Sequence, residues 1–135
     1  MTLLLLDHDD DSRRAVARLL RRNGFSVTTA SSAAQVLSMQ SRFDLAVFDF
    51  EPPHEDSLKL ARQLLDRGSV AHIVFFADTQ GVAKRQASEI GVIVNRRDGV
   101  RALTDALINL VARHQSMTGM RARRRKGRHG QAEPS

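Results

Sequence analysis

Short apolar runs alternate with stretches of helical periodicity along most of the chain. The runs are brief and almost continuous, which is typical of strands buried on both faces of a parallel sheet. Between them, apolar residues return every three or four positions, and this spacing predicts amphipathic helices. The predicted strands are residues 2–6, 25–30, 45–50, 73–76 and 92–94.

Capping residues place the predicted helices between these strands. The first helix is expected after Asp11 or Ser12, either of which can act as its N-cap, and Gly24 follows its end. Ser32 with Gln35 has the spacing of a capping box and predicts the start of a second helix. Three more helices are predicted at residues 56–68, 82–90 and 100–111. The predicted core residues of the first two helices are Ala15, Val16, Leu19 and Leu20, then Ala33, Val36 and Leu37.

This regular alternation determines the predicted fold class. Five strand and helix units joined by short connections force right-handed crossovers and a parallel sheet covered by helices on both faces. We therefore predict a doubly wound, five-stranded α/β fold of the flavodoxin-like kind. Ligands of such folds bind at the carboxyl ends of the strands, near the point where the strand order reverses. Asp7 and Asp49 both lie at such strand ends.

Composition and charge divide the chain into a body and a tail. No apolar run approaches the length of about twenty residues that a membrane span requires, so we expect a soluble, cytoplasmic protein without a membrane partner. The formal net charge of +6 is concentrated after residue 115, where six of the last fifteen residues are Arg or Lys. We predict a domain over 1–114 and a disordered basic tail over 115–135. The tail alone would allow a salt-dependent contact with nucleic acid, although a solvated tail is the simpler interpretation.

Asp7 and Asp49 are the candidate chemical groups. Two carboxylates that end neighbouring strands can converge on a divalent cation, and a carboxylate can also act as a nucleophile toward phosphorus. The alternative is that both are merely solvated strand ends, as most charged residues are. The chain has no cysteine, which excludes thiol chemistry, and it lacks a Gly-rich phosphate loop, a nucleophile elbow and a dinucleotide fingerprint.

Two stretches give the sequence a resemblance to the response-regulator receiver family, and the resemblance covers the chain from Met1 to about His114. They are LLLLDHDDDSRRAVARLL and FDLAVFDFEPPHEDSLKL, the second with Pro53 four residues after Asp49. The resemblance implies that Asp49 is the phosphoacceptor and that a histidine kinase or phosphotransfer protein donates the phosphoryl group. It also implies a magnesium ion held by Asp7, by the acidic turn and by the backbone carbonyl of Glu51. The expected function is a stand-alone signalling module that acts through protein contacts, not a metabolic enzyme.

The sequence departs from the family pattern at the positions that complete the switch. His8 stands where a second carboxylate is expected, which predicts weakened magnesium binding, with His8 either a ligand itself or a plain loop residue and with Asp9 or Asp10 as substitutes. Phe76 replaces the hydroxyl residue that contacts the phosphoryl group, and the lysine position falls on Asn95 or Arg96.

The aromatic position of the fifth strand falls on Val92. Together with Phe76, this residue supports an alternative function: a phosphorylation-independent pseudo-receiver that uses the fold as a binding surface. In that case both side chains serve only in core packing.

Overall fold

The computed structural model describes residues 1–48, 56–78 and 81–114. The chain divides after Thr104 into two compact units, and the first unit contains every described strand. The predicted basic tail, 115–135, lies outside the described residues. Within the described ranges, none of the helices combines the length and the apolar character that a bilayer crossing requires.

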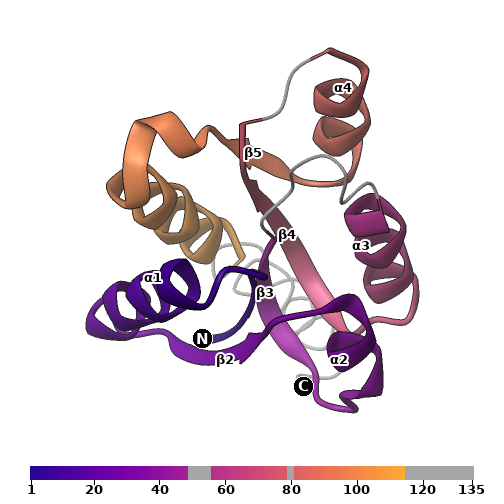
Figure 1. Ribbon diagram of the computed structural model, residues 1–135, viewed down its shortest axis with the longest axis horizontal. Coiled ribbons are helices and arrows are strands. Elements are labelled where there is room, and N and C mark those ends of the chain that lie inside the picture. The colour runs from indigo at the N-terminus through magenta and orange to yellow at the C-terminus, as the bar shows by residue number, and fades with distance from the viewer. Residues whose placement is uncertain (49–55, 79–80, 115–135) are drawn as a thin grey trace, which may run out of the picture. The chain divides into compact units, whose positions relative to one another are not determined.

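The first unit is built on a parallel sheet of five strands in the order β2-β1-β3-β4-β5 (Figure 1). The order reverses between β1 and β3, because β2 lies on one side of β1 and the later strands on the other. The prediction of a doubly wound α/β fold is therefore confirmed. The strands are β1 Thr2–Leu6, β2 Ser26–Ala30, β3 Phe43–Phe48, β4 Val70–Phe76 and β5 Val92–Val94.

Helices connect the strands as the periodicity predicted. Gly68 follows α3 with a φ of 71°, a left-handed conformation that glycine adopts without steric cost. A short 3-10 turn after β5 leads into a last helix over residues 99–114. The elements are α1 Asp10–Arg22, α2 Ala33–Ser38, α3 Asp56–Asp66, α4 Gly81–Ile90 and η1 Arg96–Asp98.

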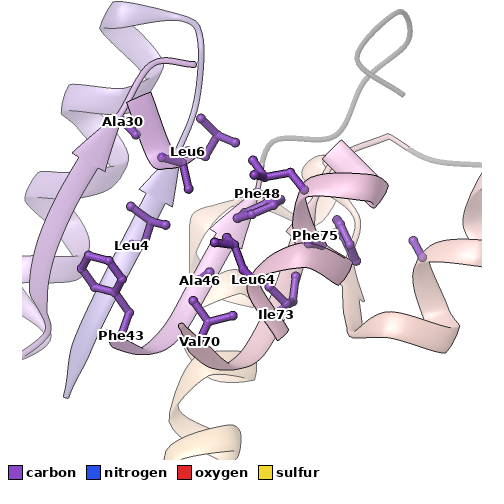
Figure 2. Packing of buried hydrophobic residues seen from close by; sticks show 14 of the residues in the cluster. Leu4, Leu6, Ala30, Phe43, Ala46, Phe48, Leu64, Val70, Ile73 and Phe75 are labelled. Carbon is purple, nitrogen blue, oxygen red and sulfur yellow. The ribbon is translucent and has the colours of Figure 1, made fainter. Parts of the chain in front are cut away.

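Both faces of the sheet are covered by helices. Figure 1 shows α1 on one face and α2 and α3 on the other. Because strand side chains alternate between faces, Leu4 and Leu6 point to the second face. There they join a buried cluster with Phe48 and Phe75, whose rings meet edge to face with centroids 6.1 Å apart (Figure 2). The central strands β1, β3 and β4 are thus buried on both sides along most of their length, as the continuous runs predicted, whereas the edge strands β2 and β5 are partly exposed.

Three details of the helices differ from the sequence prediction. Asp9, not Asp11 or Ser12, is the N-cap of α1. Leu19 and Leu37 were predicted to face the core, but their exposed fractions are 37% and 42%. In α1 the buried positions are Val16, Ala17 and Leu20, and Ala15 is exposed. Apolar spacing alone defines the buried face of a short helix only to within about one residue, and packing against the sheet determines which residues are buried.

The strands also differ from the prediction at their ends. β3 starts two residues earlier than expected, at Phe43, and β4 starts three residues earlier, at Val70. Phe43 and Val70 are register partners in the sheet, so each early start supplies the other with a neighbour. The predicted end of the third strand, residues 49–50, lies outside the described residues.

Gly91 permits the close approach of β5 to β4. A Cβ atom at this position would lie 2.3 Å from the backbone oxygen of Ile73, far inside van der Waals contact. Any larger side chain would therefore push the start of β5 away from β4. The residue matters to the site because the chain that leaves β5 carries Asn95 and Arg96.

Candidate functional site

Asp7 is a buried carboxylate at the carboxyl end of β1, with an exposed fraction of only 2%. Its backbone nitrogen donates to the carbonyl of Ala30 at 3.1 Å, which continues the pairing of β1 with β2. Its Oδ1 accepts the backbone N–H of Asp9 at 3.0 Å. A buried charge needs such partners, because an unsatisfied carboxylate away from water is costly. Asp7 is therefore held in one orientation by the turn that follows it.

Arg13 of α1 secures this turn from the other side. Its Nη1 donates to the backbone carbonyl of Asp7 at 2.9 Å, and its Nη2 pairs with Asp10. This role of Arg13 was not predicted from the sequence. A detectable signal was present, since Asp10 and Arg13 are three residues apart and such pairs lie on the same side of a helix.

The register of the sheet relates Asp7 to the position of Asp49. Leu6 and Phe48 are direct partners in the parallel pairing of β1 with β3. Asp7 follows Leu6, and Asp49 follows Phe48. Leu6 and Phe48 thus form a matched pair of strand ends at the point where the strand order reverses, and each directly precedes one of the two aspartates in the sequence. Asp49 itself, like Glu51 and Pro53, lies outside the described residues.

Asp9 caps the first turn of α1. As N-cap of α1, its Oδ1 accepts the backbone N–H of Ser12 at 3.0 Å. This hydrogen bond is the main cause that holds the pKa of Asp9 below its ordinary value, and electrostatic interactions with His8 and Arg96 act in the same direction. Because Asp10 pairs with Arg13, both candidate substitutes for the missing carboxylate already have partners in or beside α1.

His8 lies on the exposed side of the acidic turn. Among the residues that the structure describes, no three His, Cys, Asp or Glu side chains form a group able to hold a metal ion. Asp7 offers the oxygen ligand that magnesium prefers, whereas an imidazole suits softer metals. The described part of the site thus contains one buried carboxylate suited to a hard cation and a histidine that is not.

The end of β4 is occupied by an aromatic ring with a cation above it. Phe76 has an exposed fraction of 6%, and the guanidinium carbon of Arg96 lies 5.5 Å from its ring centroid. This geometry is that of a cation–π contact. Arg96 begins η1, just after β5. Its charge also acts on Asp9, which lies in the turn after the carboxyl end of β1. The positive charge of Arg96 therefore reaches the acidic turn that follows β1.

The side chain of Asn95 makes a different contact from that of Arg96. Its side chain accepts the backbone N–H of Arg97 at 2.9 Å and so caps η1. The next residue, Arg97, pairs with Asp78 at 3.4 Å on the exposed surface. Of the two candidates for the lysine position, Arg96 is the one whose guanidinium lies above β4. Val92 is half-buried and pairs with Val74 of β4.

Solved structures with the same architecture include response-regulator receiver domains. The Francisella response regulator 1452 receiver domain matches 84% of this chain and 98% of its own, with a TM-score of 0.72 at 15% identity. The Vibrio cholerae chemotaxis protein CheY4 matches 81% of this chain and 97% of its own, with a TM-score of 0.67 at 17% identity. A response regulator receiver protein from Burkholderia phymatum matches 82% and 94%, with a TM-score of 0.67 at 20% identity. The chain therefore has the fold of the response-regulator receiver domains.

The similarity in amino-acid sequence to a curated protein covers less of the chain than the structural similarities do. Protein PetR of Rhodobacter capsulatus is 41% identical over 64 residues, which are 46% of this chain and 27% of PetR. The matched segment thus spans about a quarter of that protein's length. No family model matches the chain.

Proposed function

We propose that this chain is a receiver module that accepts a phosphoryl group on Asp49 from a phosphohistidine of a histidine kinase or phosphotransfer protein. One observation carries the proposal: the buried, hydrogen-bonded carboxylate of Asp7 ends a strand whose last residue is paired with the residue before Asp49. The receiver fold makes this strand edge the expected place for ligand chemistry. The signalling role rests on this arrangement and on the fold.

The reaction is a transfer between two nucleophiles. An oxygen of the Asp49 carboxylate attacks the phosphorus of the phosphohistidine, the P–O bond forms, and the P–N bond breaks. The imidazole leaves and takes up a proton from water. The product is an acyl phosphate, and the transferred group carries its negative charges into a site that already contains the carboxylate of Asp7. Positive charge is needed to stabilise it.

Two sources of positive charge are consistent with the residues present. Asp7, Asp49 and the backbone carbonyl of Glu51 would supply the oxygen ligands that Mg²⁺ prefers, and the ion would neutralise the phosphoryl oxygens when bound. His8 contributes no negative charge to that set, so we expect weak affinity. Arg96 is the second source, since a guanidinium forms strong charge-assisted hydrogen bonds with phosphoryl oxygens. Asn95 is the weaker candidate for a phosphate contact because its side chain caps η1.

The proposal is tested by incubating the chain with acetyl phosphate and Mg²⁺ and measuring intact mass. We expect a phosphate-sized addition that hydroxylamine removes, because acyl phosphates react with this nucleophile. The addition should be lost in Asp49→Asn and kept in Asp66→Asn, a matched change at an exposed position at the end of α3. The absence of any addition, or its persistence in Asp49→Asn, would contradict the proposal.

The contact between Phe76 and Arg96 supports a second candidate, a pseudo-receiver that binds its partner without phosphorylation. Where the family resemblance expects a hydroxyl, the buried ring of Phe76 lies beneath the guanidinium of Arg96. A switch needs contacts that differ between two states. Amide exchange with and without beryllium fluoride separates the two functions: changes that reach α4 indicate a working switch, and unchanged exchange throughout favours the pseudo-receiver.

A further inference from the structure

We propose that one face of α1 binds the phosphate backbone of a nucleic acid without reading its base sequence. The face consists of Arg14, Arg18, Arg21 and Arg22, and we call it the arginine face. All four side chains are exposed, and together they line a hollow of about 490 Å³. The inference uses none of the residues assigned to phosphoryl transfer and does not depend on phosphorylation.

The arginine face is a continuous stripe. With about 100° of rotation per residue, the four positions fall within an arc of about 100° around the helix. With a rise of about 1.5 Å per residue, Arg14 and Arg22 are about 12 Å apart along the axis, with Arg18 midway. The stripe therefore presents a regular line of cations to solvent.

The described surroundings provide little compensation for this charge. Among the described residues, no carboxylate lies within salt-bridge distance of Arg14, Arg18, Arg21 or Arg22. The acidic residues of α1 are confined to its first turn, where Asp10 already pairs with Arg13. The strand that packs beside α1, the edge strand β2, has the sequence SVTTA and contributes no negative charge (Figure 1).

Ordinary helix chemistry explains only part of this stripe. Arg21 and Arg22 lie in the last turn of α1, where cations interact favourably with the helix dipole. Arg21 also donates from Nη2 to the backbone carbonyl of Val27 at 3.1 Å. Arg14 and Arg18 lie nearer the middle of the helix, and neither explanation applies to them. Like charges four residues apart destabilise a helix, so an external anion is the partner that this arrangement fits.

A nucleic acid backbone fits the stripe better than an acidic protein does. One strand of a duplex carries a phosphate every 3.4 Å along its axis, so a line of about 12 Å faces three to four phosphates in regular succession. Guanidinium groups bind phosphate in a bidentate manner. The arginine face has no aromatic residue to stack on bases, and the whole chain lacks Trp and Tyr. The contact would therefore position the chain on a backbone and carry no sequence information.

The test uses the full chain and a short fluorescein-labelled DNA duplex, with anisotropy measured at several salt concentrations. Replacing Arg14, Arg18 and Arg22 together by Gln keeps the helix-forming length of the side chains and removes three charges. The slope of log K against log salt should become less steep by about 2.7, since each phosphate contact contributes about 0.9. Between about 50 and 200 mM salt, the affinity of the original chain should therefore fall about fortyfold more than that of the variant.

A matched variant controls for net charge. Arg42, Arg62 and Arg67 are exposed positions outside α1, and their joint replacement by Gln removes the same charge. Both variants keep the basic tail, so a difference between them reports the position of the charge. Far-UV circular dichroism confirms folding, and the Lys versions of the three α1 changes should retain the original salt slope.

Three results would overturn the inference. Equal effects of the two Gln variants would show that net charge alone governs binding. An unchanged slope in the α1 variant would assign binding to the tail. Tighter binding of a labelled polyglutamate peptide than of the duplex, at equal charge and salt, would show that the arginine face prefers an acidic protein.

Discussion

The contact between Arg96 and Phe76 can be measured by a double-mutant cycle. Arg96→Met removes the charge and keeps the aliphatic length, and Phe76→Leu removes the ring and keeps an apolar side chain in the core. The cycle cancels the other interactions of Arg96, including its effect on Asp9, because only the pairwise term between the two side chains survives. It therefore isolates the contact that replaces a hydroxyl at the end of β4.

The structure gives the expected magnitude. Arg96 lies 5.5 Å from the ring centroid, within the range of about 6 Å for a cation–π contact. Such contacts contribute about 0.5–1 kcal/mol when exposed and about 2 kcal/mol when desolvated. Phe76 is buried and Arg96 is half-buried, so we expect a coupling of about 1 kcal/mol.

Urea unfolding followed by far-UV circular dichroism is the suitable assay, because the chain has no Trp or Tyr to report by fluorescence. The control cycle pairs Phe76→Leu with Arg97→Met, since Arg97 is adjacent in sequence but pairs with Asp78. Its coupling should be zero within about 0.3 kcal/mol. An equally small coupling for Arg96 would refute the reasoning, and the guanidinium would then be held by other groups.

Further predictions concern acid stability, strand packing and cation binding. The pKa of Asp9 in the folded chain lies below the ordinary value of 3.8. The ionised carboxylate therefore stabilises the fold fully above pH 3.8, and this stabilisation is lost as the pH falls through the folded pKa. In Asp9→Asn the thermal midpoint should therefore decline less steeply in acid. Gly91→Ala should lower the free energy of unfolding by about 1–3 kcal/mol, because its Cβ would overlap the carbonyl of Ile73; an unchanged urea midpoint would contradict this close approach. His8→Asp should tighten Mg²⁺ binding in titration calorimetry, and equal affinity would place His8 away from the cation.

These experiments separate two properties of the site. The Asp49 modification tests whether the strand edge performs phosphoryl transfer. The cycle at Arg96 and the His8 variant test how the charge is balanced there, and they give a result even if Asp49 is not modified. A chain with a strong Arg96 contact, weak cation binding and no modification would correspond to the pseudo-receiver.

Much of the fold was determined by the sequence pattern alone. Continuous apolar runs such as residues 3–6 are buried on both sides, and helical periodicity between such runs leaves parallel pairing as the accessible topology. The strand ends that follow from this topology make Asp7 and Asp49 the candidate residues from the sequence alone. The N-cap of α2 was also predicted from the sequence, since the side chain of Ser32 accepts the backbone N–H of Gln35 as the capping pattern indicated.

Only the tertiary structure decided which of several equivalent residues takes each role. Asp9, Asp10 and Asp11 are three successive residues of the same type, and in the structure Asp9 is the N-cap of α1. Asn95 and Arg96 were both candidates for the lysine position, and the structure distinguishes them because Asn95 caps η1 whereas the guanidinium of Arg96 lies above the ring of Phe76. Periodicity specifies a face to within about one residue, but a hydrogen bond or a ring contact depends on positions within a fraction of an ångström. Those positions are set by the packing of segments far apart in the chain, as when the carbonyl of Ile73 excludes a side chain at Gly91.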